Sequence, residues 1–156
     1  MTPQSSAKIP WVLFSAMIAV LGPLGGRDKA LQPHFKYVAG TESVAYGCSG
    51  SVQLTTDSLI FRCEQSNVSV PYSSISVMQY RPDVSKRVRK MSLSWKLRPP
   101  HGHGKKNRFF TVVSNQNGTA HAIVLEVAPD AMRPYLAEID VKSGKRVEVR
   151  GYESYD

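Results

Sequence analysis

The stretch CSGSVQLTTDSLIFRC, residues 48–63, carries the strongest indication of the fold. Apolar and polar side chains alternate on both sides of the turn-forming residues 55–58, a pattern that predicts a β-hairpin. A two-residue loop at 55–56 would place Cys48 and Cys63 directly opposite each other, within reach of a disulfide. A four-residue loop would offset them by one diagonal step.

Cys48 and Cys63 are the only cysteines of the chain. An even number of cysteines in an oxidising compartment favours pairing, so we expect a disulfide between them. The alternative is two buried free thiols that act as small apolar residues.

Further strand-like runs follow on both sides of this hairpin. Residues 91–98 alternate apolar and polar side chains without a break, the cleanest strand pattern in the chain. Strands are also expected at 35–39, at 68–80 as one strand bent by Pro71, and at 108–113 and 121–127 as a hairpin with its turn at Asn117-Gly118.

Beyond residue 127 the apolar residues recur at helical spacing. Asp130 is expected to cap this helix, Pro134 to be tolerated close to its first turn, and Ser143-Gly144 to end it. Residues 146–150 are either a last short strand or a tail. The chain is therefore expected to be mainly β, a small barrel or sandwich of about seven antiparallel strands closed by one C-terminal amphipathic helix.

The order of these elements resembles that of GRAM and bacterial pleckstrin-homology-like (PH-like) domains. The resemblance rests on two stretches, Gly50-x-Val52-x-Leu54-Thr55-x-Asp57-x-Leu59-Ile60-Phe61 and Val68-x-Val70-Pro71-Tyr72-Ser73-x-Ile75, and would cover residues 35–141. It implies a non-enzymatic platform that binds lipid headgroups, peptides or proteins. Residues 50–61 contain no lysine or arginine, unlike lipid-binding members, and the helix offers Tyr135 rather than a tryptophan, so no ligand-binding residue is carried over.

The N-terminus predicts export. Residues 9–26 carry no charge and follow a short polar stretch with one lysine, which is typical of a signal sequence. We expect residues 1–30 to be a signal peptide or a membrane anchor, with cleavage and retention both open, and residues 31–156 to form one domain. The expected location is the cell envelope, periplasmic or extracellular.

The net charge of +8 is concentrated in one segment. Residues 81–108 hold ten basic residues and one acid, whereas the other 128 residues hold ten basic residues and eleven acids. With the apolar residues of 91–98 facing inward, the cations would converge on one edge of the sheet. The residues expected to bind a ligand are Lys86, Arg87, Arg89, Lys90, Lys96, Arg98, Lys105, Lys106 and Arg108.

An anionic membrane surface or an acidic protein is the partner that this charge favours. The alternative is a solvated edge that keeps the sheet from pairing with others. Nucleic acid is disfavoured by the export signal and by Trp95, which is expected to face inward.

No nucleophile, metalloprotease or phosphate-loop motif is present, so no catalytic residue and no cofactor are expected. His101 and His103 are too few ligands for a stable metal site. His34 and His121 have no evident partner. The leading interpretation is a non-enzymatic exported or envelope-anchored binding module. The alternatives are a small hydrolase that uses a histidine of the 99–104 loop, and a structural component of an envelope complex.

Overall fold

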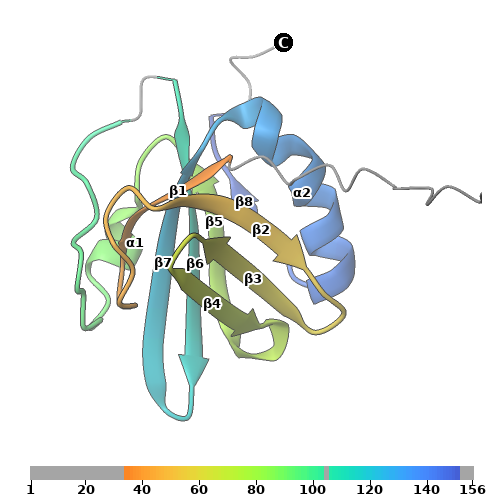
Figure 1. Cartoon of the computed structure of the whole chain (residues 1–156), viewed down its shortest axis with the longest axis horizontal. Coiled ribbons are helices and arrows are strands. Elements are labelled where there is room, and N and C mark those ends of the chain that lie inside the picture. Colours follow the sequence, from red (N-terminus) through yellow and green to blue (C-terminus); the bar gives the residue numbers. More distant parts are fainter. Residues whose placement is uncertain (1–33, 104–105, 152–156) are drawn as a thin grey trace, which may run out of the picture.

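The computed structural model describes residues 34–103 and 106–151 (Figure 1). The expected signal or anchor at residues 1–30 lies outside these ranges. Within them, no helix has the length and apolar character needed to cross a bilayer. The elements are β1 (Phe35–Gly40), β2 (Ser49–Leu54), β3 (Ser58–Cys63), β4 (Ser66–Pro71), the 3-10 turn η1 (Tyr72–Ser74), β5 (Ile75–Arg81), α1 (Lys86–Arg89), β6 (Arg108–Gln116), β7 (Thr119–Val127), α2 (Pro129–Ser143) and β8 (Glu148–Val149).

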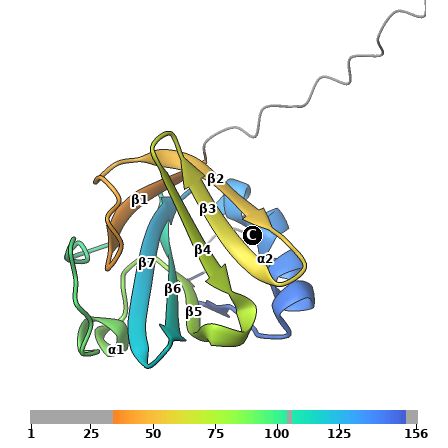
Figure 2. The ribbon, with the colours of Figure 1, turned by 60° about the horizontal axis from the view of Figure 1, so that its bottom comes forward.

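The strands form one sheet in the order β4-β3-β2-β1-β7-β6-β5-β8. All neighbours are antiparallel except β5 and β8. The sheet bends so that β3 and β4 run at an angle to β6 and β7 (Figure 2), and it does not close into the barrel that was one of the two expected architectures. The prediction of a mainly β fold with one C-terminal helix is confirmed, whereas the all-antiparallel sheet is corrected by the short parallel strand β8.

Two apolar cores lie on opposite faces of this sheet. The inner core fills the bend and includes Phe61, Phe110 and Leu125, with Met132 and Ile139 of α2 packed into it. Tyr135 of α2 meets Phe35 of β1 edge to face, with ring centroids 5.1 Å apart. The outer core lies on the other face of β1, β5, β6 and β7. Helix α2 therefore covers the inner core, and the outer core needs another cover.

The β2–β3 hairpin has the four-residue loop. Leu54 pairs with Leu59, and Cys63 consequently lies opposite Gly50, with Cys48 one diagonal step away. The disulfide between Cys48 and Cys63 is confirmed, with the two Cα atoms 6.0 Å apart. Gly50 permits this close pairing, because a Cβ atom there would collide with the carbonyl oxygen of Arg62.

Residues 68–80 do not form one bent strand. They are two strands, β4 and β5, which lie at distant positions in the sheet and are separated by η1. Tyr72 fixes this turn because its hydroxyl donates to the carbonyl oxygen of Thr55 at 3.0 Å and its backbone N–H donates to that of Asp57 at 2.8 Å. The chain thereby passes from one layer of the bent sheet to the other.

Helix α2 begins two residues earlier than a cap at Asp130 requires. Ala128 occupies the N-cap and Pro129 follows it, so Asp130 lies in the first turn and the predicted cap is wrong. A carboxylate there is still favourable, because it faces the positive end of the helix dipole. Pro134 lies inside the helix rather than in its first turn, and Gly144 ends the helix with a φ of 65°.

The disulfide is expected to stabilise this fold by about 3 kcal/mol, since it closes a loop of 15 residues in the unfolded chain. The double variant Cys48→Ala/Cys63→Ala should unfold at a lower urea concentration than the oxidised wild type. Reduced wild type is the control and should resemble the variant. Superimposable unfolding curves for the oxidised wild type and the variant would contradict the assigned role.

Candidate functional site

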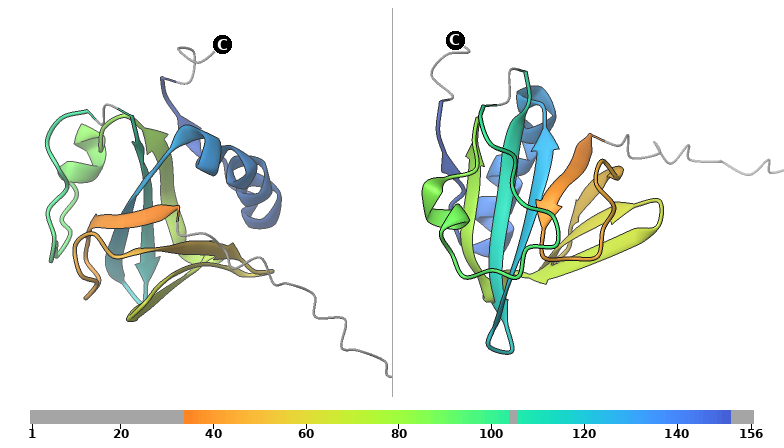
Figure 3. Two further views of the ribbon diagram at one scale, coloured as in Figure 1. Left: turned by 45° about the horizontal axis from the view of Figure 1, so that its top comes forward. Right: turned by 90° about the vertical axis from the view of Figure 1, so that its left-hand side faces the viewer.

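Between β5 and β6, the described residues 82–103 and 106–107 belong to a strap over the outer face of the sheet (Figure 3). It opens with α1, whose N-terminus is capped by Ser85 through a 3.3 Å hydrogen bond from the backbone N–H of Val88. It then reaches β1, where Gly40 and Leu97 exchange backbone hydrogen bonds of 3.0 and 3.1 Å. The strap backbone is thus tied to β1 at Leu97.

Residues 91–98 are not the strand that their alternation predicts. They lie within the strap and make a single bridge, between Leu97 and Gly40. The predicted directions of the side chains are confirmed for Met91, Leu93 and Trp95, which pack against the outer core while their polar neighbours are exposed. Leu97, predicted on the same side, packs against the inner core instead. Alternation indicates only that an extended segment has one buried side and one solvent-exposed side. A strap that lies on a sheet and an edge strand both meet this condition.

Most of the predicted ligand-binding cations are exposed on the outward side of this strap. We define the basic surface as the six exposed residues, Lys86, Arg87, Lys90, Lys96, Arg98 and Lys106. Lys105 lies outside the described residues. The apolar side chains of Val88, Met91, Leu93 and Trp95 pack against the outer core, so the strap that carries these cations covers the outer face of the sheet (Figure 3). The predicted convergence on a sheet edge is corrected, since β6 lies between β7 and β5.

Two of the predicted residues have structural contacts instead. The guanidinium of Arg89 donates to the carbonyl oxygens of Val84 at 2.8 Å and Pro100 at 2.6 Å, which ties the start of the strap to its return. Arg108 is buried and donates to the carbonyl oxygens of Arg150, at 2.8 Å, and Gly151. Neither guanidinium is placed to join the basic surface.

Few carboxylates neutralise the basic surface. Asp83 pairs with Arg81 at 3.2 Å, and Glu148 pairs with Arg87 at 3.4 Å. In the described part of the chain, the other five cations of the basic surface have no carboxylate within 4.0 Å. Lys96 donates to the hydroxyl of Ser43. Such a surface attracts anions through long-range charge rather than through a shaped cavity.

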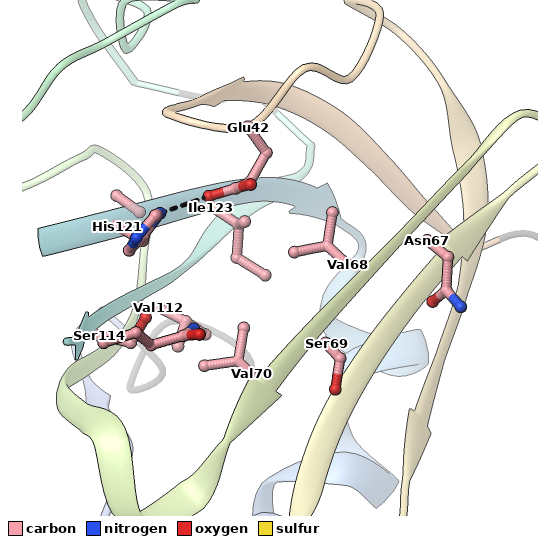
Figure 4. Close-up of a pocket in the computed structure, with 11 residues that line it drawn as sticks. Glu42, Asn67, Val68, Ser69, Val70, Val112, Ser114, His121 and Ile123 are labelled. Atoms are coloured by element: carbon pink, nitrogen blue, oxygen red, sulfur yellow. Dashed lines mark hydrogen bonds and ion pairs between the residues drawn. The ribbon is translucent and has the colours of Figure 1, made fainter. Parts of the chain in front are cut away.

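The described histidines lie in two different surroundings, an exposed loop and the mouth of a cavity. His101 and His103 are both exposed in the strap, and among the described residues no group of three or more histidine, cysteine or acidic side chains is placed to hold a metal ion. His121, expected to have no partner, contacts Glu42, with 2.8 Å between Nδ1 and Oε1 (Figure 4). The two are 79 residues apart in sequence, so only the pairing of β1 with β7 brings them together.

Glu42 and His121 line the mouth of a cavity of about 140 Å³ between β4 and the β6–β7 hairpin. This cavity opens on the inner side of the bent sheet, whereas the strap lies on the outer face. No local sequence pattern predicts this cavity, because its lining comes from four separate segments. The basic surface and the cavity are therefore independent features.

No protein-family model matches the chain, and comparison with curated proteins finds no significant similarity.

The two kinds of cation in the strap should respond differently to substitution. Arg89→Gln is expected to lower the free energy of unfolding by about 1–3 kcal/mol, because it leaves two carbonyl oxygens without a charged donor. Lys90→Gln, its exposed neighbour, should change stability by less than about 0.5 kcal/mol. Urea unfolding of both variants provides the comparison, and equal losses would contradict the assignment of Arg89.

Proposed function

We propose that this chain is a non-enzymatic binding module that docks its basic surface onto an anionic lipid membrane. One observation carries the proposal: six exposed cations lie on one strap over one face of the sheet, and five of them have no carboxylate partner among the described residues. Exposed lysines on flexible stems contribute little to folding, so their accumulation in one segment calls for a partner outside the chain.

The type of surface favours lipid over an acidic protein. A protein partner is usually fixed by buried aromatic or arginine anchors in pockets, whereas lipid headgroups rearrange around cations that lie on an open face. Trp95, the one large aromatic of the strap, packs against the outer core, and Arg89 is held by carbonyl oxygens. The described part of the basic surface therefore offers exposed charge without a buried aromatic or arginine anchor.

The architecture is compatible with the proposed PH-like domain. Supporting features are the first four strands in antiparallel succession, the later β5–β6–β7 set and the helix packed against the inner core. The resemblance of residues 50–61 and 68–75 points the same way. In this proposal the uncharged stretch at residues 9–26 directs the chain out of the cytoplasm and, if retained, holds the module beside a bilayer.

Vesicle flotation tests the proposal with variants of equal charge. The triple variant Lys86→Ser/Lys90→Ser/Lys106→Ser removes three cations from the basic surface. The matched control Arg62→Ser/Arg146→Ser/Arg150→Ser removes three exposed cations outside the strap. Each cation near an anionic leaflet contributes about 1 kcal/mol, so the strap variant should bind vesicles of phosphatidylcholine and phosphatidylglycerol roughly 100-fold more weakly than the wild type. The control variant should lose far less affinity.

Binding should also fall when salt is raised to about 1 M, where the Debye length is about 3 Å. Equal recovery with neutral and anionic vesicles, or equal losses in the two triple variants, would overturn the lipid proposal. Absence of vesicle binding together with a strap-dependent complex with an acidic protein would assign the surface to that other class of partner.

A further inference from the structure

Strand β4 leaves one row of backbone groups without a partner strand. It is the last strand on its side of the sheet and pairs only with β3. The pairing of Cys63 with Ser66 across a two-residue loop makes Cys63 and Ser66 a hydrogen-bonded pair, and the bonding then alternates along the strand. The N–H and C=O groups of Asn67 and Ser69 consequently point away from β3.

Pro71, the next residue in this outward series, has no N–H to donate, which is tolerated only at such an edge. The part of the edge that can form hydrogen bonds with an added strand is therefore short. It offers a donor and an acceptor at Asn67 and again at Ser69, the spacing at which an extended chain presents its own groups. No lysine blocks this edge, since β4 reads SNVSVP.

The cavity of about 140 Å³ lies directly beside this edge. Val68 and Val70 of β4 point into it toward Val112 and Ile123 (Figure 4). A strand added to β4 would carry alternate side chains on the same face as Val68 and Val70, so one of them would enter the cavity. The volume suits one side chain, because sites for drug-sized molecules usually measure about 300–1,000 Å³.

The mouth of the cavity carries a carboxylate. Oε1 of Glu42 contacts Nδ1 of His121 at 2.8 Å and accepts from the hydroxyl of Thr41 at 3.1 Å. Thr41 is itself held by the backbone N–H of Ala122 at 3.0 Å, so the carboxylate is fixed in place. No hydrogen bond to Oε2 of Glu42 is found among the described residues, and the cavity lining contains no lysine or arginine.

An aliphatic floor that ends at a fixed carboxylate matches a side chain with an apolar stem and a cationic tip. We infer that the edge of β4 binds an extended peptide segment of a partner protein and takes a lysine or arginine of that peptide into the cavity. The peptide adds a strand through Asn67 and Ser69, which supplies main-chain hydrogen bonds, and its cation meets Oε2 of Glu42, which supplies selectivity. This site is separate from the basic surface, so either proposal can fail without the other.

An array of nine-residue peptides with a fixed alternating threonine and valine background tests the inference. The central residue is each of the twenty amino acids in turn, and binding to the intact chain is measured by fluorescence polarisation. Lysine and arginine should bind most tightly, although the chain carries a net charge of +8 and would repel them non-specifically. Methylation of the peptide nitrogens that face β4 should weaken binding at least about tenfold.

Two matched pairs of variants locate the site. Ser69→Pro removes an N–H that β3 does not use and should weaken lysine-peptide binding at least about tenfold, whereas Ser69→Ala keeps the N–H and should bind normally. Glu42→Gln should weaken binding of the lysine peptide about tenfold and leave binding of the uncharged methionine peptide unchanged. Circular dichroism and urea unfolding check that each variant is folded.

Absence of binding by every peptide up to millimolar concentration would overturn the inference. So would a preference for acidic or aromatic central residues, or equal binding to Ser69→Pro and Ser69→Ala. Concentration-dependent dimerisation that Ser69→Pro abolishes would replace the peptide with a second copy of this chain as the occupant of the edge.

Discussion

The β6–β7 pair is apolar on both faces, and this constraint shapes the rest of the fold. In β6, Phe110 and Val112 point to the inner core while Phe109 and Val113 point to the outer core. A sheet with two apolar faces must be covered twice, because exposing either face to water would cost about 25 cal/mol for each Å² of apolar surface. The bend of β2–β4 with α2 covers one face, and the strap covers the other. Without the strap, the outer core would be an exposed patch.

This requirement explains why the strap has an apolar side and a polar side, but it does not make the polar side basic. A covering segment needs an apolar underside, and its outward side faces water, so alternating side chains divide between the two. Burial fixes the positions of Val88, Leu93 and Trp95, but it leaves the outward residues free to vary. Their composition is not dictated by folding. The outward residues are therefore where the chain can adapt to a partner without disturbing the core.

Local sequence patterns predicted turns and the disulfide correctly, but they did not predict how distant segments are arranged in space. The β6–β7 turn follows from Asn117-Gly118, whose φ angles of 53° and 78° suit a two-residue turn, and the disulfide follows from alternation within one hairpin. Residues 91–98 were predicted as a strand because alternation reports only that one side is buried; it does not reveal whether a neighbouring strand exists. The separation of β4 from β5 depends on hydrogen bonds of Tyr72 to the distant residues 55 and 57, and the Glu42–His121 contact depends on strand pairing. Such long-range contacts leave no local pattern.

The two sides of the sheet differ in how they could recognise a partner. The outer side presents charges on a strap that Arg89 braces internally and Leu97 ties to β1, so its interactions are electrostatic and sensitive to salt. The inner side presents a short unpaired edge, a small cavity and one fixed carboxylate, a combination that selects by backbone geometry and by a single side chain. Because β6 and β7 lie between the strap and the edge of β4, a membrane bound to the strap would leave the edge of β4 accessible. The architecture thus accommodates attachment to a surface and recognition of a peptide at the same time, with no residue shared between them.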